Sequence, residues 1–211
     1  MTEPPWTDAP LTALDLEGTG AQDRDNEAIL EIAVVPLAGG LPAVNDAYET
    51  LVNPGRPVPR RPWISPGLTD AVLREAPEPE AVAPELLRRL NGRFIVGHNV
   101  GVDWRLLHLR FPEVRPAGII DTLKLAKLTG APKRSLTALT DAYRLTDRVN
   151  ELVPGGRPHR ALWDAVAAAL LLAELVAEHW LRTPSLNELV AGAGEGWGAE
   201  GDGGYEQTSL L

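Results

Sequence analysis

The apolar positions of the first 52 residues recur in short runs that are typical of β-strands. Residues 11–16, 28–37 and 47–52 carry mainly apolar side chains, and the second run is apolar at nearly every position. Gly18 and a polar stretch up to Asn26 separate the first two runs, which suits a loop or hairpin connection. Because no helical pattern lies between these runs, we predict three strands in an antiparallel meander.

The remaining pattern alternates between short apolar runs and helical periodicity. Five prolines fall between residues 54 and 66, which indicates an extended surface segment. Further short strands are expected at residues 94–97 and 119–121. We predict helices at residues 69–75, 80–90, 100–110, 123–128, 136–143 and 161–181. Strands first, and then strands alternating with helices, indicate an α/β domain with a mixed sheet of about five strands flanked by helices.

Length and composition fit one domain followed by a tail. The 211 residues can bury one sizeable core, and 44% apolar and 23% charged residues are ordinary for a globular protein. Gly and acidic residues fill the segment 191–206, a composition that is typical of disorder. We therefore assign residues 1–184 to the domain and residues 185–211 to a flexible Gly-rich and acidic tail.

Charge and residue usage exclude some classes of protein. A net charge of −9 argues against a protein that coats duplex nucleic acid, but an enzyme that grips a few nucleotides at a strand end remains compatible with it. The lack of cysteine excludes disulfides and Cys-based zinc sites and suits a cytoplasmic location. No secretory signal is recognisable at the N-terminus. Asp164, Glu174 and Glu178 interrupt the apolar run 161–181, so we expect a buried helix and no membrane contact.

Two acids share one face of the first predicted strand. Asp15 and Glu17 are two residues apart, and side chains at this spacing point the same way on a strand. Leu14 and Leu16 then point to the opposite face. Acids on a central strand need a reason to be buried, whereas acids on a surface edge strand do not. Both interpretations of this pair remain open from the spacing alone.

A third acid begins the predicted helix 100–110. Asp103 follows a short apolar strand and a turn at His98 and Asn99. The helix dipole favours an acid in the first turn, and the turn residues can satisfy backbone groups, so a purely structural role is as compatible as a functional one.

A histidine and an acid precede and begin the predicted helix 161–181. His159 and Asp164 are five residues apart, so on one continuous helix they would point roughly 140° apart. Because Gly155 and Gly156 precede His159, we place this histidine on a loop and Asp164 in the first turns of the helix. A carboxylate on a rigid element suits a metal ligand, and an imidazole on a loop suits a general base. A surface histidine and an early-turn acid are the alternative.

In combination, these positions resemble the DEDDh branch of the DnaQ-like 3′→5′ exonucleases, a family with an RNase H-like fold. The resemblance covers residues 11–181. Its three motifs are Asp15-Leu16-Glu17-Gly18-Thr19-Gly20, Gly97-His98-Asn99-x-x-x-Asp103 and His159-x-x-x-x-Asp164.

Two positions refine the resemblance. A related branch of the family has a tyrosine one turn before the last acid, and Arg160 at this position indicates the histidine branch. Gly18 is a departure, because the family usually has Thr or another hydroxyl residue there. This departure bears on the grip on substrate more than on the chemistry.

The resemblance implies hydrolysis of phosphodiester bonds with two divalent ions. Asp15, Glu17 and Asp164 are expected to bind one Mg²⁺ or Mn²⁺. Asp15 is expected to bridge to a second ion, which Asp103 supports directly or through water. His159 is the expected general base. The expected products are nucleoside 5′-monophosphates from the 3′ end of single-stranded DNA, in replication proofreading or repair.

The resemblance also implies contacts with the substrate strand. The segment 18–19 would lie beside the terminal nucleotide, and the segment 98–99 would help to hold the strand. The segment 64–68 is one that the family often packs against the last base, with core packing as the alternative. The candidate substrate-binding residues are Gly18, Thr19, His98, Asn99, Ile64 and Leu68.

The last residues and the choice of substrate complete the sequence predictions. Gln207, Leu210 and Leu211 resemble the short peptides that dock on the bacterial DNA sliding clamp. The expected partners are therefore a single-stranded DNA 3′ end, a sliding clamp or a polymerase. An exoribonuclease that trims RNA ends is the second candidate, and a non-catalytic module that binds nucleic acid or a partner is the third.

Overall fold

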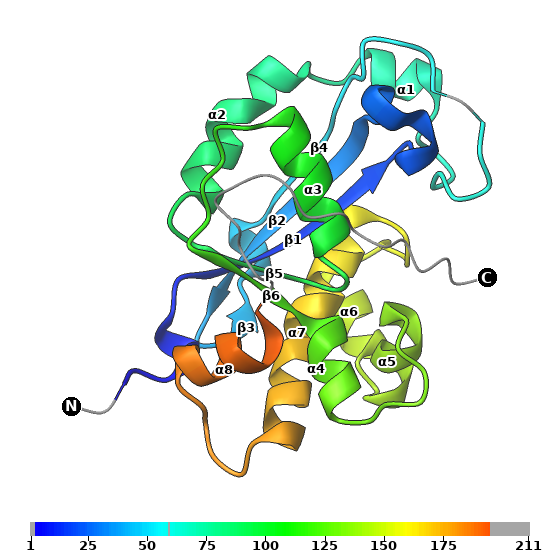
Figure 1. Cartoon of the computed structure of the whole chain (residues 1–211). Helices are drawn as coiled ribbons and strands as arrows, with labels where there is room; N and C mark the ends of the chain where they lie inside the picture. The colour runs from blue at the N-terminus through cyan, green and yellow to red at the C-terminus, as the bar shows by residue number, and fades with distance from the viewer. Residues whose placement is uncertain (1–2, 59, 195–211) are drawn as a thin grey trace.

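A six-stranded mixed sheet forms the centre of the computed structural model, which describes residues 3–58 and 60–194 (Figure 1). Its strands follow the order β3-β2-β1-β5-β6, and β4 also pairs with β2. β1 is antiparallel to β2 and parallel to β5, and β5 is parallel to β6. The strands are β1 (Leu11–Gly18), β2 (Ile29–Ala38), β3 (Leu41–Pro42), β4 (Tyr48–Leu51), β5 (Phe94–Gly97) and β6 (Gly118–Asp121).

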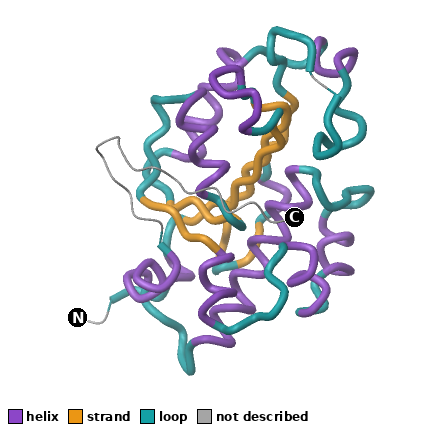
Figure 2. The backbone as a smooth tube through the Cα atoms, turned by 45° about the vertical axis from the view of Figure 1, so that its right-hand side comes forward, coloured by secondary structure: helices purple, strands orange, loops and turns teal. Residues whose placement is uncertain are grey.

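Helices cover both faces of this sheet (Figure 2). α7 packs across β1 and β2 on one face and contacts α4, α5 and α6, whereas α2 and α3 cover the other face. The helices of the described residues are α1 (Asp70–Arg74), α2 (Pro79–Leu90), α3 (Gly101–Arg110), α4 (Thr122–Leu128), α5 (Leu136–Ala142), α6 (Thr146–Leu152), α7 (Ala161–His179) and α8 (Leu186–Ala193). The predicted α/β class, mixed sheet and flanking helices are confirmed.

The alternation of side chains along β1 decides where its acids point. Leu11 and Ala13 are buried in the cluster that contains α7, and Leu14 is buried in the cluster that contains α2 and α3. Asp15 and Glu17 follow Leu11 and Ala13 at the same two-residue period, so they project toward α7. β1 is a central strand between β2 and β5, which removes the alternative of a surface edge strand.

The early part of the topology agrees with the meander that the sequence predicts. β2 is antiparallel to both β1 and β4, and no α-helix interrupts these three strands. The two-residue strand β3 extends the sheet beyond the predicted number of strands, because Leu41 and Pro42 pair with the end of β2. A pairing this short leaves no recognisable period in the sequence.

Two short helices were absent from the sequence prediction. α6 has one buried apolar residue, Val149, so its apolar period is too weak to be recognised. α8 is held by a capping box in which the Ser185 hydroxyl accepts from the Glu188 backbone and the Glu188 carboxylate accepts from the Ser185 backbone.

Helix α8 also corrects the predicted tail. Leu189 and Ala193 are buried, and the helix packs against α4, β6 and the 3₁₀ turn at Trp6–Asp8. The assignment of residues 185–194 to a flexible tail is therefore wrong. The small residues of α8 let the helix pack closely against neighbouring elements. Residues 195–211 lie outside the described part of the chain.

Across the described residues, no helix combines the length and the apolar composition that crossing a lipid bilayer requires. α7 is the most apolar helix, and its apolar residues are buried against the sheet and against α4, α5 and α6 instead.

Candidate active site

Three carboxylates from two elements meet on the α7 face of the sheet. Asp15 and Glu17 come from the C-terminal half of β1, and Asp164 comes from the first turn of α7. Each offers one oxygen, and these three oxygens lie within 4.8 Å of one another. All three residues are half-buried. Acids that are remote in sequence are therefore brought to one point, as the sequence predicts.

The fourth predicted acid lies beside this group. Asp103 is in the first turn of α3, and its Oδ1 accepts a hydrogen bond of 3.1 Å from the Leu16 backbone nitrogen. Leu16 stands between Asp15 and Glu17, so this bond ties α3 to the acid-bearing part of β1. Asp103 is close enough for its charge to raise the pKa of Asp15.

The pKa values of all four acids are raised above their ordinary values. Burial raises the pKa of Asp15 well above its ordinary value, and the charges of Asp103 and Asp164 add to this effect. Burial and then the charge of Asp164 raise the pKa of Glu17 to about 8. Burial raises the pKa of Asp103 to about 7 and that of Asp164 to about 6. Divalent cations would relieve this repulsion, so the donor set fits hard metal ions.

His159 stands at the rim of the acid group. It is separated from α7 by Arg160 and is exposed, and its backbone nitrogen donates to Asp164 Oδ1 over 3.3 Å. Its φ of 63° lies in the left-handed region, which is uncommon for a residue other than glycine. The structure therefore places His159 on a loop and Asp164 on the helix, as the spacing predicts.

The turn that follows β1 is closely packed around Gly18. A Cβ there would lie 3.0 Å from Leu106 Cδ2 and 3.2 Å from the Ala28 carbonyl oxygen. A side chain at this position would require the Leu106 side chain and the Ala28 carbonyl to give by a few tenths of an ångström. Thr19 is fully buried, and its hydroxyl accepts a 3.0 Å bond from the Ala28 backbone nitrogen. Its side chain thus holds the turn together.

The two polar residues after β5 have different surroundings. His98 Nδ1 lies 2.9 Å from Thr122 Oγ1 and Nε2 lies 2.7 Å from the Arg134 carbonyl oxygen, and burial lowers the pKa of the ring. His98 therefore fastens the segment before α5. Asn99 has a φ of 59°, and its backbone nitrogen donates to Asp121 Oδ1, while its side chain is exposed.

The apolar residues predicted to meet the last base are used in packing. Leu68 is buried with Leu30 and Leu73, and Ile64 packs against the same cluster. The exposed apolar residue of this segment is Trp63, which the sequence prediction did not include. Trp63 Nε1 donates to the Thr19 carbonyl oxygen over 3.2 Å. An aromatic residue beside a proline-rich surface segment was the available signal.

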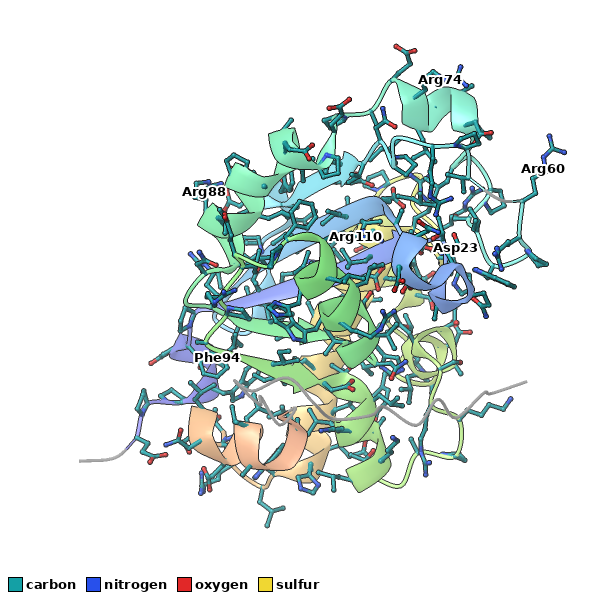
Figure 3. The ribbon with its side chains drawn as sticks, turned by 45° about the horizontal axis from the view of Figure 1, so that its top comes forward. Asp23, Arg60, Arg74, Arg88, Phe94 and Arg110 are labelled. Carbon is teal, nitrogen blue, oxygen red and sulfur yellow. The ribbon has the colours of Figure 1, made fainter. Side chains whose placement is uncertain are left out.

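Arginines fix the loop between β1 and β2 from both sides. Arg56 and Arg61 form ion pairs of 3.0 and 2.7 Å with Asp23. From α3, Arg105 pairs with the buried Glu27 at 2.6 Å, and Arg110 donates to backbone oxygens of the same loop. Figure 3 shows Asp23 on this loop close to the helix that ends at Arg110. The turn next to the acid group is thereby held in place.

One further buried acid was missed. Glu31 interrupts the apolar run of β2 and lies opposite Glu17 in the β1–β2 register. It has no exposed surface, and its carboxylate pairs with Arg160. A lone acid in a run that is otherwise apolar is a recognisable signal, since buried carboxylates require partners.

Comparison with known proteins identifies the family. The family model RNase_T, described as exonuclease, matches residues 12–172. The chain belongs to this exonuclease family. The matched range includes the four acids and His159. The protein is a nuclease of the hydrolase class, and its fold is that of the RNase H-like, DnaQ-type exonucleases.

Two relatives of this exonuclease are DNA polymerase III proteins by name. It is 37% identical over 176 residues to a PolC-type DNA polymerase III of Thermotoga maritima, covering 80% of this chain but 12% of that protein. It is 30% identical over 182 residues to a DNA polymerase III subunit epsilon of Aquifex aeolicus, covering 83% of this chain and 84% of that subunit.

A solved structure supports the same relationship. Exonuclease X in complex with 5′ overhanging duplex DNA superposes with a TM-score of 0.61 and 28% sequence identity, covering 85% of this exonuclease and 98% of that chain.

Proposed function

We propose that this exonuclease removes nucleoside 5′-monophosphates from the 3′ end of single-stranded DNA, in replication proofreading or repair. The observation that carries the proposal is the meeting of Asp15, Glu17 and Asp164, with Asp103 beside them and His159 at the rim. The names of the polymerase III relatives and the DNA bound to exonuclease X support DNA as the substrate. A cytoplasmic setting agrees with this role.

The acid group is the proposed site for Mg²⁺ or Mn²⁺. Asp15, Glu17 and Asp164 would hold one ion, and Asp15 with Asp103 would hold a second. Four carboxylates with raised pKa values form an all-oxygen donor set, which is the type of ligand these hard cations prefer. When bound, the ions supply Lewis-acid activation of a water and neutralise the charge of the leaving 3′-oxygen.

The protein's own part in the reaction is proton transfer and positioning. His159 accepts the proton of the attacking water, and its exposed position lets the ring approach the scissile phosphate. Asp164 accepts from the His159 backbone and so keeps the loop next to the acid group. α3 and β1 hold the remaining acids through the bond from Leu16 to Asp103.

Trp63 is the proposed platform for a base of the substrate strand, in place of Ile64 and Leu68. Its side chain is 47% exposed, and the Arg61 guanidinium lies 5.3 Å from the ring centroid. The bond from Nε1 to Thr19 keeps the ring at the turn that follows Glu17. Aromatic stacking is worth about 1–3 kcal/mol per base. Trp63→Ala should therefore raise KM about tenfold and leave kcat nearly unchanged, whereas Trp63→Phe, which keeps a stacking ring but loses the bond to Thr19, should raise KM less.

Backbone groups of the turn and the exposed Asn99 side chain are the other proposed contacts with the strand. The hydroxyl of Thr19 and the ring of His98 are already engaged within the protein. We therefore assign Thr19 and His98 to holding the surface that the strand meets, and Gly18 to letting α3 approach this turn.

Digestion of matched DNA and RNA oligonucleotides tests the proposed function. With a 5′ label and Mg²⁺ or Mn²⁺, the DNA should shorten one nucleotide at a time to give a labelled ladder, and a chelator should abolish the reaction. Faster digestion of RNA would favour the exoribonuclease. Immediate release of labelled mononucleotide would contradict the 3′→5′ polarity, and binding without hydrolysis would favour a non-catalytic module.

The last residues carry a separate proposal. Gln207, Leu210 and Leu211 lie outside the described residues, and their resemblance to clamp-binding peptides comes from sequence alone. A peptide of residues 202–211 should bind a purified bacterial sliding clamp, and the same peptide with Gln207, Leu210 and Leu211 changed to Ala should not. Equal binding by both peptides would refute the assignment.

A further inference from the structure

The buried ion pair between Glu31 and Arg160 joins the sheet to the loop that carries His159. Arg160 Nε lies 3.0 and 2.9 Å from the two carboxylate oxygens of Glu31, and Nη2 donates to Oε1 as well. The Glu31 side chain has no exposure and that of Arg160 is 31% exposed. A planar guanidinium that binds a carboxylate through two of its nitrogens fixes orientation as well as distance.

The same carboxylate also holds the beginning of α7. Glu31 Oε2 accepts a bond of 3.3 Å from the Ala161 backbone nitrogen. Ala161 is the first residue of α7, and the helix has no cap from the side chain of its own N-cap residue, Arg160. Glu31 therefore supplies from β2 the acceptor that a helix N-terminus requires, and a negative charge is favoured there.

The residues that contact Glu31, namely Arg160 and Ala161, lie in the sequence between His159 and Asp164. His159 immediately precedes Arg160, and Asp164 lies one turn after it, with its backbone nitrogen bonded to the Arg160 carbonyl oxygen over 3.0 Å. The left-handed backbone of His159 persists only where neighbouring contacts determine it. Those contacts are its own bond to Asp164 and the Arg160 pair on the other side.

Glu31 is unsuited to be a ligand itself. Its oxygens already accept from Arg160 and Ala161, and the group of acids whose oxygens converge does not include it. Its charge would nevertheless add to that of the cluster, since it lies opposite Glu17. Arg160 compensates this charge: burial is the main cause of the raised Glu17 pKa, the Glu31 charge raises that pKa further, and Arg160 lowers it.

We propose that Glu31 and Arg160 are positioning residues. They hold the segment from His159 to Asp164 in place beside Asp15 and Glu17 without touching substrate or metal. The effect that we expect on kcat rests on the proposed function. The structural content of the proposal, that this pair sets the backbone from His159 to Asp164, does not depend on activity.

The kinetic test compares single and paired replacements. Glu31→Gln and Arg160→Gln should each lower kcat about 10–100-fold, the range for residues that orient functional groups, with KM changed less than about twofold. Arg160→Lys should not restore kcat, because a lysine cannot form the two-nitrogen contact. If the replacements act through one interaction, the double Gln variant should be no slower than the slower single variant.

A paired apolar replacement distinguishes loss of the contact from unfolding of the protein. Glu31→Met combined with Arg160→Met leaves no unpaired buried charge and should fold even where a single variant does not. The matched control is Arg182→Gln, which removes another two-nitrogen Arg–Glu pair, to Glu188, in the segment between α7 and α8. This control should retain parental kcat.

Amide hydrogen exchange supplies a readout that is independent of hydrolysis. In metal-free protein, exchange at His159, Ala161 and Asp164 should be faster in Arg160→Gln and in the double Met variant than in the parent, and unchanged in Arg182→Gln. Parental exchange at these amides together with parental kcat in the double Met variant would overturn the proposal. A parent without nuclease activity would instead refute the proposed function, and the exchange data would still decide the role of the pair.

Discussion

At the scale of single residues, the main feature of the site is its concentration of carboxylates. Burial raises the pKa values of Asp15, Glu17, Asp103 and Asp164, and the charges of neighbouring acids raise them further. Such a group destabilises the fold unless a ligand compensates it, and residues of this kind cluster at functional sites. The acids are therefore expected to be important for turnover and unfavourable for stability.

Asp15→Asn tests whether an acid of this group is needed for turnover and is unfavourable for stability. The replacement keeps the shape of the side chain but removes a charge from the centre of the group. Turnover should fall at least about 100-fold, as for loss of a preorganised charge-stabilising group, while the Tm of the metal-free protein should stay equal or rise. Asp8→Asn, at an exposed acid in the first 3₁₀ turn, is the control and should change neither quantity. Parental turnover in Asp15→Asn would end the assignment.

His159→Asn separates proton transfer from backbone geometry. Asparagine tolerates the left-handed region, so the loop should keep its shape while the base is lost. We expect kcat to fall about 10²–10⁴-fold with little change in the affinity for the strand. His179→Asn, at the far end of α7, should behave as the parent. A loss below threefold across the pH range would remove His159 from the mechanism.

At the residue scale, the sequence predicted the placement of the acids and the histidine on their elements where local geometry decides it. The two-residue spacing of Asp15 and Glu17, and the position of His159 before a helix, were readable because each depends on local geometry. Trp63 and Glu31 were missed because their roles depend on contacts with Thr19 and Arg160, which are remote in sequence. Leu68 is buried with Leu30 and Leu73, which is the core packing that the sequence analysis gave as the alternative to a contact with substrate.

At the scale of elements, the long and strongly periodic segments were predictable and the short ones were not. α7 and β2 are nearly continuous apolar runs, so their burial follows from composition. α6 and α8 have seven and eight residues. α6 depends on its packing against α7, and α8 on its capping box and tertiary contacts, more than on their own period. Glycine in α8 suggested a tail, but Gly192 lies beside Trp180 and Leu128.

Truncation tests whether α8 belongs to the domain. A chain that ends at Pro184 loses the helix that covers Trp6 and carries the buried Leu189, so its free energy of unfolding should fall by several kcal/mol. A chain that ends at Gly194 keeps these contacts and should unfold with parental stability in urea. Equal stability of the two truncated chains would contradict the packing of α8.

At the scale of the whole molecule, the acid group links stability to pH and to metal. In the metal-free protein, Asp164, Asp103 and Glu17 have pKa values of about 6, 7 and 8, above their ordinary values of 3.8, 3.8 and 4.5. Between about pH 4 and pH 8 these three acids therefore bind more protons in the folded state than in the unfolded state. By linkage, their contribution to stability is present at low pH and is lost as pH rises through this window.

A pH series of thermal unfolding tests this link. With chelator present, Tm should decrease from pH 5 to pH 8, and Mg²⁺ or Mn²⁺ should remove most of this decrease because metal binds the ionised folded form. Glu85 and Glu188, whose pKa values are lowered from 4.5 to about 2, titrate below pH 5 in both states. Burial lowers the pKa of His98, which opposes the trend, but with one proton against those of three acids. A chelated protein whose Tm rises steadily over the same range would contradict the arrangement.

The position of bound Mn²⁺ tests the central claim most directly. Crystals of the protein grown with saturating Mn²⁺ would be measured at the manganese absorption edge, so that anomalous difference density locates the ions. The account predicts density bounded by carboxylate oxygens of Asp15, Glu17 and Asp164, and its loss in Asp15→Asn. Saturated crystals in which these carboxylates bind no manganese, or in which manganese binds only elsewhere, would contradict it.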